Sequence, residues 1–223
     1  MKNANVRFAW LAGVLLAIPL LCLAAGAAAS ASSKGKEGLL SLGAPAPDFR
    51  LPDVVTGKVV SRDDFSGKRG LLVMFICRHC PYVQHVKQGL AQLGKDYAGK
   101  EIGIVAISSN DAFSIKQDAP DSLKEMALEE RFVFPFLYDE TQEVAKAYTA
   151  ICTPDLFLFD QDRRLIYRGQ FDDSRPGGGP VTGKDIRAAI DAVLAGRQVH
   201  PYQSPSEGCS IKWKPGNEPA YAR

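Results

Sequence analysis

The feature that most constrains this chain is a pair of cysteines, two residues apart, placed between an apolar run and a predicted helix. The segment reads Cys77-Arg78-His79-Cys80-Pro81 and directly follows the apolar run 71–76. A continuous apolar run of this length is typical of a strand that is buried on both faces. The dipole and the free N–H groups of a helix N-terminus stabilise a thiolate. Two thiols at such a position can form and break a disulfide, so the sequence predicts redox chemistry here.

The two residues between the sulfurs add positive charge. We expect Arg78 and, when it is protonated, His79 to lower the pKa of Cys77. Cys77 is then expected to be the exposed nucleophile, and Cys80 the shielded sulfur that resolves a mixed disulfide. A lower pKa stabilises the reduced form, so a reduction potential between roughly −270 and −120 mV is expected.

Half of a zinc site is the alternative interpretation of two cysteines at this spacing. Structural zinc takes four ligands, and the chain has no second pair of cysteines two residues apart. Completing the site would require ligands from Cys152, Cys209, His85 or His200. We therefore expect no metal and no bound cofactor, because the dithiol is itself the redox centre. For His79, the alternative to a role in tuning the pKa is an exposed loop histidine without a role. We expect His85 to be a surface or packing residue.

The N-terminus has the pattern of an export signal. Lys2 and Arg7 form a short basic start, 8–23 is apolar, and small residues fill 24–31. A cleavage site among the small residues is typical of a secretory signal, whereas an uncleaved membrane anchor is the alternative. The protein is therefore expected to be exported, to a bacterial periplasm or as a secreted protein, or to be anchored in the membrane at its N-terminus.

The chain beyond the leader has the composition of one folded domain. Without Lys2 and Arg7 the chain has 25 basic and 25 acidic residues, so nothing indicates a nucleic-acid partner, and a membrane contact is expected only if the leader is uncleaved. We predict a signal or anchor at 1–31, a linker at 32–43, a folded domain at 44–197 and an irregular tail at 198–223.

Hydrophobic periodicity predicts strands that alternate with helices, then a hairpin and a last helix, which gives an α/β sandwich with a mixed sheet. Asp121 or Ser122 is expected to cap one helix and Thr182 the last one. The predicted strands are 46–51, 58–61, 71–76, 102–108, 134–138, 156–160 and 165–170, and the predicted helices are 81–97, 121–131, 142–148 and 185–194.

This arrangement resembles the thioredoxin fold over roughly residues 44–197. The residues that carry the resemblance are Ala46-Pro47-Asp48-Phe49, the Cys77–Cys80 motif, and Thr153-Pro154-Asp155 before the apolar run 156–159. The resemblance implies a three-layer α/β sandwich, with a central mixed sheet flanked by helices and an N-terminal β-hairpin extension. It also implies that Pro154 is a cis-proline facing the dithiol, and that Thr153 and Pro154 form a groove where a substrate strand pairs.

More narrowly, the chain resembles the AhpC/TSA (redoxin) branch, and within it a peroxiredoxin-like subgroup with a CxxC pair and a C-terminal stretch that is here 208–213. Two expected features of peroxiredoxins are missing. They carry a threonine three residues before the peroxidatic cysteine, where this chain has Met74 before Cys77 and Cys77 before Cys80. Their activating arginine, usually just before the hairpin strand, is replaced here by Thr153-Pro154.

Two further cysteines remain in the folded part, Cys152 and Cys209. Three alternatives stay open for them: a structural disulfide that ties down the tail, a second redox pair that relays electrons to the CxxC pair, or two unpaired thiols.

The sequence thus predicts an exported thiol–disulfide oxidoreductase whose partner is a protein disulfide or dithiol, or a small thiol. A peroxiredoxin-like thiol peroxidase with antioxidant activity, acting on peroxide, is the first alternative. A copper or haem-assembly thiol chaperone is the second, because soft thiolates select Cu(I).

Overall fold

A computed structural model of the chain describes residues 38–222. The predicted leader, 1–31, and residues 32–37 of the predicted linker lie outside the described residues. Within 38–222, no helix has both the length and the hydrophobicity that crossing a membrane requires.

A five-stranded mixed sheet forms the centre of the domain, in the order β5-β4-β3-β7-β8. Strand β3 pairs in parallel with β4 on one side and antiparallel with β7 on the other, so it is the central strand. The strands are β3 (Gly70–Phe75), β4 (Ile102–Ser108), β5 (Phe136–Tyr138), β7 (Asp155–Phe159) and β8 (Leu165–Gly169).

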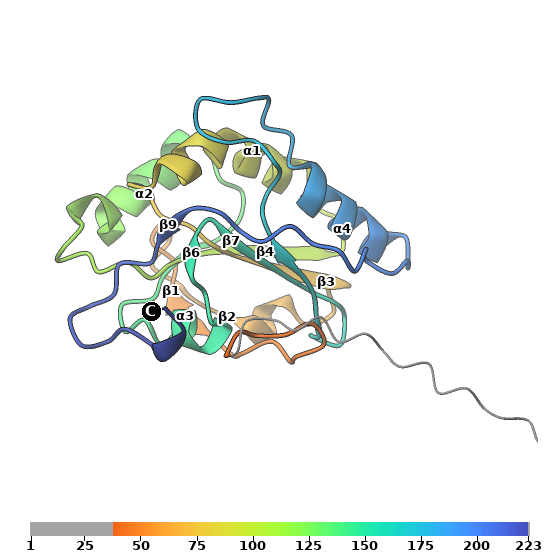
Figure 1. Cartoon of the computed structure of the whole chain (residues 1–223), viewed down its shortest axis with the longest axis horizontal. Coiled ribbons are helices and arrows are strands. Elements are labelled where there is room, and N and C mark those ends of the chain that lie inside the picture. The colour runs from red at the N-terminus through yellow and green to blue at the C-terminus, as the bar shows by residue number, and fades with distance from the viewer. Residues whose placement is uncertain (1–37, 223) are drawn as a thin grey trace, which may run out of the picture. The chain divides into compact units, whose positions relative to one another are not determined.

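Helices cover both faces of this sheet (Figure 1). One face carries α1 (Pro81–Tyr97), α2 (Pro120–Glu129) and α4 (Lys184–Leu194), and the other carries α3 (Glu143–Tyr148) with the hairpin of β1 (Arg50–Pro52) and β2 (Val59–Ser61). The short 3-10 helices are η1 (Arg62–Phe65), η2 (Lys116–Asp118) and η3 (Ala220–Ala222). The predicted three-layer α/β sandwich with a mixed sheet and an N-terminal hairpin is confirmed.

The alternation of side chains along β3 explains why the sheet needs cover on both faces. Leu72 and Met74 belong to the core beneath α1, α2 and α4, whereas Leu71, Val73 and Phe75 belong to the core beneath α3 and the hairpin. All six residues of β3 are buried. Because successive side chains of a strand point to opposite faces, a strand without polar residues must be buried on both faces of the sheet.

Two predicted helix caps were wrong. Helix α2 starts at Pro120 with Ala119 at the cap, because a proline at the first helical position has no N–H to satisfy and its φ is already helical. Helix α4 starts after Gly183, which has a φ of 65° and lies against the ring of Phe171, rather than at a Thr182 cap.

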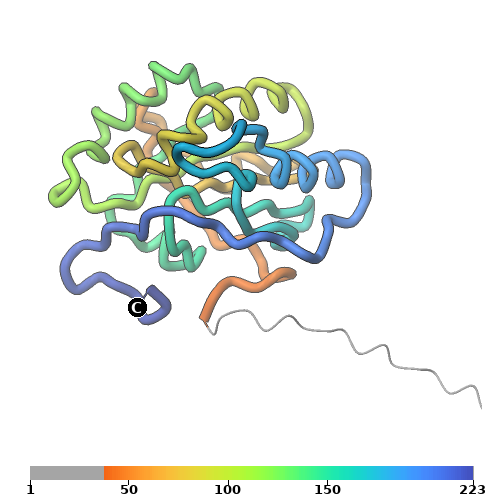
Figure 2. Tube along the Cα trace, turned by 45° about the horizontal axis from the view of Figure 1, so that its top comes forward, coloured from red at the N-terminus to blue at the C-terminus, as the bar shows by residue number. Residues whose placement is uncertain are grey.

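The tail is less irregular than the sequence indicates. Strand β9 (Cys209–Ser210) pairs antiparallel with β6 (Cys152–Thr153), the two-residue strand just before β7. Figure 2 shows the blue tail running back from α4 across the molecule. The tail therefore returns to the part of the chain that follows α3.

Candidate active site

The CxxC pair lies where the central strand passes into the first helix. Strand β3 ends at Phe75, and Cys80 is the cap residue of α1 with Pro81 at the first helical position. This is the carboxyl end of a central strand, where sheets of this kind bind ligands. Both cysteines are fully buried, each 0% exposed, so the expected exposure of Cys77 is wrong for this structure. Both cysteines belong to the main core cluster, and the sulfur of Cys77 is in contact with His79 and Thr153.

Thr153 and Pro154 lie against the two sulfurs. The Thr153–Pro154 peptide bond is cis. The hydroxyl Oγ1 of Thr153 lies 3.2 Å from Cys77 Sγ, and the carbonyl oxygen of Thr153 lies 3.1 Å from Cys80 Sγ. Thr153 therefore bridges both members of the pair.

A buried carboxylate organises the loop that holds the cysteines. Asp118, on η2, is 0% exposed and accepts the backbone N–H groups of Arg78 and His79 at 2.8 and 3.0 Å. Its other oxygen lies 2.5 Å from His79 Nδ1, and Asn110 donates to that oxygen at 2.8 Å. Asp118 thereby fixes both the backbone and the imidazole between the cysteines.

His79 Nδ1 also faces the nucleophile, at 3.5 Å from Cys77 Sγ. One ring nitrogen is thus directed at a carboxylate and a sulfur together. An N–H on this nitrogen is held by Asp118, the nearer acceptor, and reaches a Cys77 thiolate only as the longer branch of a shared hydrogen bond.

Arg78 does not act on the sulfurs as expected. Its guanidinium points to α2, where it pairs with Glu125 at 2.7 Å and Glu129 at 3.3 Å and donates to the Ser122 carbonyl at 2.8 Å. Two carboxylates offset its charge, so its effect is to tie the CxxC loop to α2.

The electrostatics of the pair are the reverse of the sequence prediction. The hydrogen bond from Cys77, together with the N–H groups of Val83 and Cys209, lowers the pKa of Cys80 to about 4. The pKa of Cys77 is raised far above its usual range, first by its hydrogen bond to Cys80, then by burial and by the charge of Asp118. The expected lowering of the Cys77 pKa is therefore wrong for the reduced pair, in which the two sulfurs share one proton and Cys80 carries the charge at the helix N-terminus.

All four cysteines of the described region are free: Cys77, Cys80, Cys152 and Cys209. The disulfide between Cys152 and Cys209 is absent, because the strand pairing places Cys152 opposite Ser210 and Cys209 opposite Thr153. The Cys152 thiol points to the Pro154 carbonyl at 3.6 Å, and burial raises its pKa. Cys209 instead packs against the core that contains Cys80, and the pKa of each of these two cysteines depends on the other.

Cys77, His79 and Asp118 are also the described residues that could hold a metal ion, with ligand atoms all within 4.8 Å of one another. An ion there would have to replace the hydrogen bond between His79 and Asp118. The other histidines have different contacts: His85 with Ser174 at 3.0 Å, and His200 with the backbone of Tyr202. The zinc site that would draw on them does not form in the described chain.

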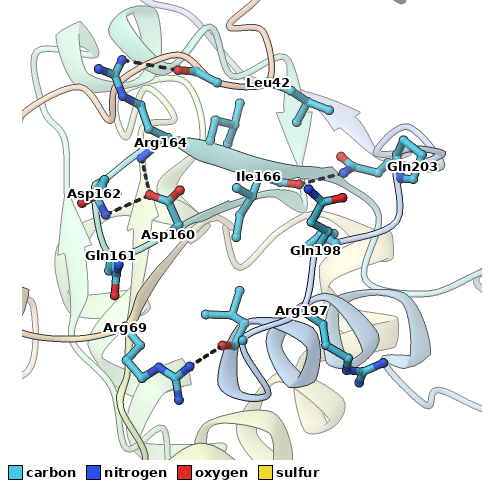
Figure 3. Close-up of a pocket in the computed structure, with 16 residues that line it drawn as sticks. Leu42, Arg69, Asp160, Gln161, Asp162, Arg164, Ile166, Arg197, Gln198 and Gln203 are labelled. Carbon is cyan, nitrogen blue, oxygen red and sulfur yellow. Dashed lines mark hydrogen bonds between the residues drawn. The ribbon is translucent and has the colours of Figure 1, made fainter. Parts of the chain in front are cut away.

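A cavity of about 690 Å³ opens at the other end of β3 (Figure 3). Arg69, which precedes β3, lines it together with the turn 160–164 and residues 196–199 beyond α4. Its lining contains no cysteine. It lies at the opposite end of the strand from the dithiol and takes no part in that chemistry.

The fold and the paired cysteines define the class, a thioredoxin-like protein. The thioredoxin domain of a thiol-disulfide oxidoreductase from Bacteroides vulgatus is similar in fold, with a TM-score of 0.52 at 20% identity over 66% of this chain and 96% of that one. The AhpC/TSA family matches residues 42–168. The chain belongs to the AhpC/TSA family.

Two relatives are more similar in sequence. The crystal structure of an uncharacterized conserved protein from Geobacillus kaustophilus is 54% identical, with a TM-score of 0.77 over 79% of this chain and 94% of that one. The thiol-disulfide oxidoreductase ResA of Bacillus thuringiensis subsp. konkukian (strain 97-27) is 26% identical over 147 residues, which are 66% of this chain and 80% of that protein. The match to ResA, together with the AhpC/TSA family match, confirms the prediction that the chain is an oxidoreductase enzyme.

Sequence reasoning missed Asp118 and Gly208. Asp118 stands in a loop 39 residues from His79 and has no local pattern to mark it. A Cβ on Gly208 would lie 2.0 Å from the Thr153 carbonyl oxygen, so this position requires glycine. The sequence offered one signal for the contact between Gly208 and Thr153, namely a glycine directly before a cysteine in a tail with little periodicity.

Proposed function

We propose that this protein is an exported thiol–disulfide oxidoreductase that works through the Cys77–Cys80 dithiol. Cys77 attacks a partner disulfide, and Cys80 displaces the partner from the resulting mixed disulfide. Each turnover oxidises the two thiols to one disulfide and reduces the partner disulfide to two thiols. Running in reverse, the same steps oxidise a partner dithiol.

The observation that carries the proposal is the contact of both sulfurs with Thr153. Cys77 and Cys80 hydrogen-bond to the hydroxyl and the carbonyl of the residue before the cis-proline. A strand that pairs with Thr153 is thereby brought alongside both reacting atoms. We infer that Thr153 and Pro154 form the groove for the substrate backbone.

The surroundings of the pair give the two sulfurs different roles. Cys80 carries the charge of the reduced pair, since its pKa is lowered to about 4, and it accepts hydrogen bonds at the start of α1. When the proton that the sulfurs share moves to Cys80, Cys77 becomes the thiolate. The imidazole N–H of His79, held by Asp118, can then stabilise Cys77 during attack.

The test is the reduction potential of the pair, measured by equilibration against glutathione. We expect a reversible two-electron couple between Cys77 and Cys80 that Cys77→Ser and Cys80→Ala each abolish and that Cys152→Ser leaves unchanged. Trypsin can cleave after Arg78, so the Cys77–Cys80 disulfide appears as peptides 70–78 and 79–87 joined by one bond. A wild-type protein without this reversible couple would overturn the proposal.

A thiol peroxidase of the peroxiredoxin-like subgroup is the second candidate. Thr153 Oγ1 at 3.2 Å from Cys77 Sγ supports it, because a hydroxyl lies beside the sulfur even though Met74 occupies the usual threonine position. Among residues 38–222, however, no arginine hydrogen-bonds to Cys77. Rapid consumption of hydrogen peroxide by the reduced protein, lost in Cys77→Ser, would favour the peroxidase.

The leader pattern in 1–31 supports export and a partner outside the cytoplasm. The partner is a protein disulfide or dithiol, or a small thiol. Sequencing the N-terminus of the protein recovered from the exporting cell, by Edman degradation, would distinguish cleavage from an uncleaved anchor.

A further inference from the structure

The tail occupies the position that the proposed substrate strand requires. Strand β9 pairs antiparallel with β6, and Cys209 is the residue opposite Thr153. In the proposed function the substrate backbone pairs with Thr153 and presents its cysteine to the dithiol. The chain itself places a strand with a cysteine there.

This fit is built into the sequence of the tail. The backbone of Gly208 approaches the Thr153–Pro154 peptide so closely that a Cβ would lie 2.0 Å from the Thr153 oxygen and 2.7 Å from its carbonyl carbon. Any other residue at 208 would push β9 away from the cis-proline. A glycine directly before Cys209 therefore sets the distance between the tail and the dithiol.

Polar contacts hold the tail on both sides of Cys209. Before it, Ser206 donates to the buried carboxylate of Asp155 at 2.7 Å, and Glu207 accepts from Arg175 at 2.7 Å and from Tyr82 at 3.1 Å. After it, the backbone N–H of Lys212 donates to Asn110 at 2.8 Å. Cys209 is thus a fixed element of the site.

The sulfur of Cys209 adjoins one member of the pair. Cys209 stands opposite Thr153, whose carbonyl oxygen lies 3.1 Å from Cys80 Sγ, and its side chain packs against the core that contains Cys77 and Cys80. Cys152, two residues before the cis-proline, faces the Pro154 carbonyl instead. Of these two cysteines, Cys209 is the one that stands opposite the residue in contact with both sulfurs of the pair.

We propose that Cys209 is a third redox cysteine, which exchanges with the Cys77–Cys80 disulfide to give a Cys80–Cys209 disulfide. The Cys209 thiolate attacks the sulfur of Cys80, a new bond forms between these two sulfurs, and the Cys77–Cys80 bond breaks. The electron pair of the broken bond leaves on Cys77 as a thiolate. Cys209 loses one proton to solvent and Cys77 takes one up, so no external oxidant or reductant is consumed.

The charges around Cys209 change when Cys80 is oxidised. In the reduced protein the pKa of Cys209 is raised to about 11, first by burial and then by Cys80. Once Cys80 is part of a disulfide it carries no charge, so burial and the charge of Lys212, which lowers the pKa, remain. The exchange frees Cys77 as a thiol while Cys80 stays oxidised, so the domain can hold a disulfide next to a free cysteine.

The exchange rests on the proposed function, and one experiment separates the two. The full mature chain is oxidised with diamide, alkylated in acid, digested with trypsin and analysed by mass spectrometry. Cys80, Cys152 and Cys209 fall on the separate peptides 79–87, 147–163 and 198–212. In Cys77→Ser we expect peptides 79–87 and 198–212 to be joined within a monomer, and the same in Cys77→Ser/Cys152→Ser.

Adding Cys209→Ser to Cys77→Ser should abolish this joined pair and leave Cys80 available to glutathione. If Cys77→Ser instead joins 79–87 to 147–163, joins two chains, or forms only a glutathione adduct, the exchange is overturned. That result leaves the proposed function intact as long as the wild-type chain still joins 70–78 to 79–87 reversibly. If the wild-type chain fails to do so, the proposed function itself is overturned.

Discussion

The imidazole of His79 and the carboxylate of Asp118 form the shortest of the contacts that connect the CxxC loop to the helix η2, with Nδ1 and Oδ2 2.5 Å apart. The contact continues in both directions, to Cys77 Sγ at 3.5 Å and to Asn110 at 2.8 Å. Asn110 in turn accepts the Lys212 N–H, so the dithiol and the tail share one hydrogen-bonded chain.

Replacing Asp118 should make Cys77 easier to ionise. The charge of Asp118 raises the pKa of Cys77, and a nearby charge of this kind shifts a pKa by about one to three units. In a Cys80→Ser background, where Cys77 titrates without its partner, Asp118→Asn should lower the Cys77 pKa by about one unit or more. The measurement is the ultraviolet absorbance of the thiolate against pH. Asp96→Asn, which removes a carboxylate bound to Arg187 instead, is the control, and an unchanged or higher pKa in Asp118→Asn would contradict the prediction.

The reduction potential should depend on pH with half the slope of an ordinary dithiol. The pKa of Cys80 is lowered to about 4 and that of Cys77 is raised far above its usual range, so the reduced pair holds one proton at neutral pH. Reduction then takes up one proton with two electrons, and the potential should fall by about 30 mV per pH unit between about pH 5 and pH 8. Two ordinary thiols would give about 60 mV per unit. Redox titration at several pH values decides between the slopes, with Cys152→Ser as the matched control.

Gly208→Ala should expose the dithiol. The added Cβ would overlap the Thr153 carbonyl, and overpacking of this kind costs about 1–3 kcal/mol, which corresponds to roughly 5- to 150-fold in the fraction of chains with a displaced tail. We expect the reduced variant to react faster with iodoacetamide at Cys77 and Cys80 by a factor in this range. Gly179→Ala is the control, because its Cβ would meet nothing within 4 Å. Equal alkylation rates in the two variants would show that the tail does not shield the sulfurs.

Arg168→Met should destabilise the folded domain. Arg168 pairs at 3.3 Å with Asp155, which is 1% exposed and whose pKa is raised by burial. Removing one partner of a buried ion pair costs about 3–5 kcal/mol, because the other charge is left uncompensated. Urea denaturation of the reduced protein measures the loss. Arg164→Met removes an exposed arginine whose contact is the Gly43 carbonyl at 3.4 Å, and it should leave the stability nearly unchanged.

Local patterns in the sequence predict much of this fold. The bounds of α1 and β4 were predicted to the residue, because an amphipathic helix with a proline at its start and a continuous buried strand each leave a strong local signal. The caps of α2 and α4 were wrong because Pro120 and Gly183, rather than the nearby hydroxyl and acidic residues, set where the helices begin.

The site could be predicted only where its residues stand together in the sequence. The residues of the CxxC loop are neighbours in the sequence, and the motif around Pro154 resembles the cis-proline motif of the thioredoxin fold. The contacts of Asp118, and the pairing of Cys209 with Thr153, join residues that lie tens of positions apart, and no periodicity records them. The effect expected of Arg78 failed for the same reason, because Glu125 and Glu129 reach it from α2.

The pairing of β9 with β6 has a kinetic consequence for any partner that must use the same groove. A large partner can engage Thr153 only in the moments when β9 has detached, so its observed rate should reach a plateau as its concentration rises, at the rate of detachment. A small oxidant that slips past the tail would show no such ceiling. The ratio of the two rates would report how often the tail opens.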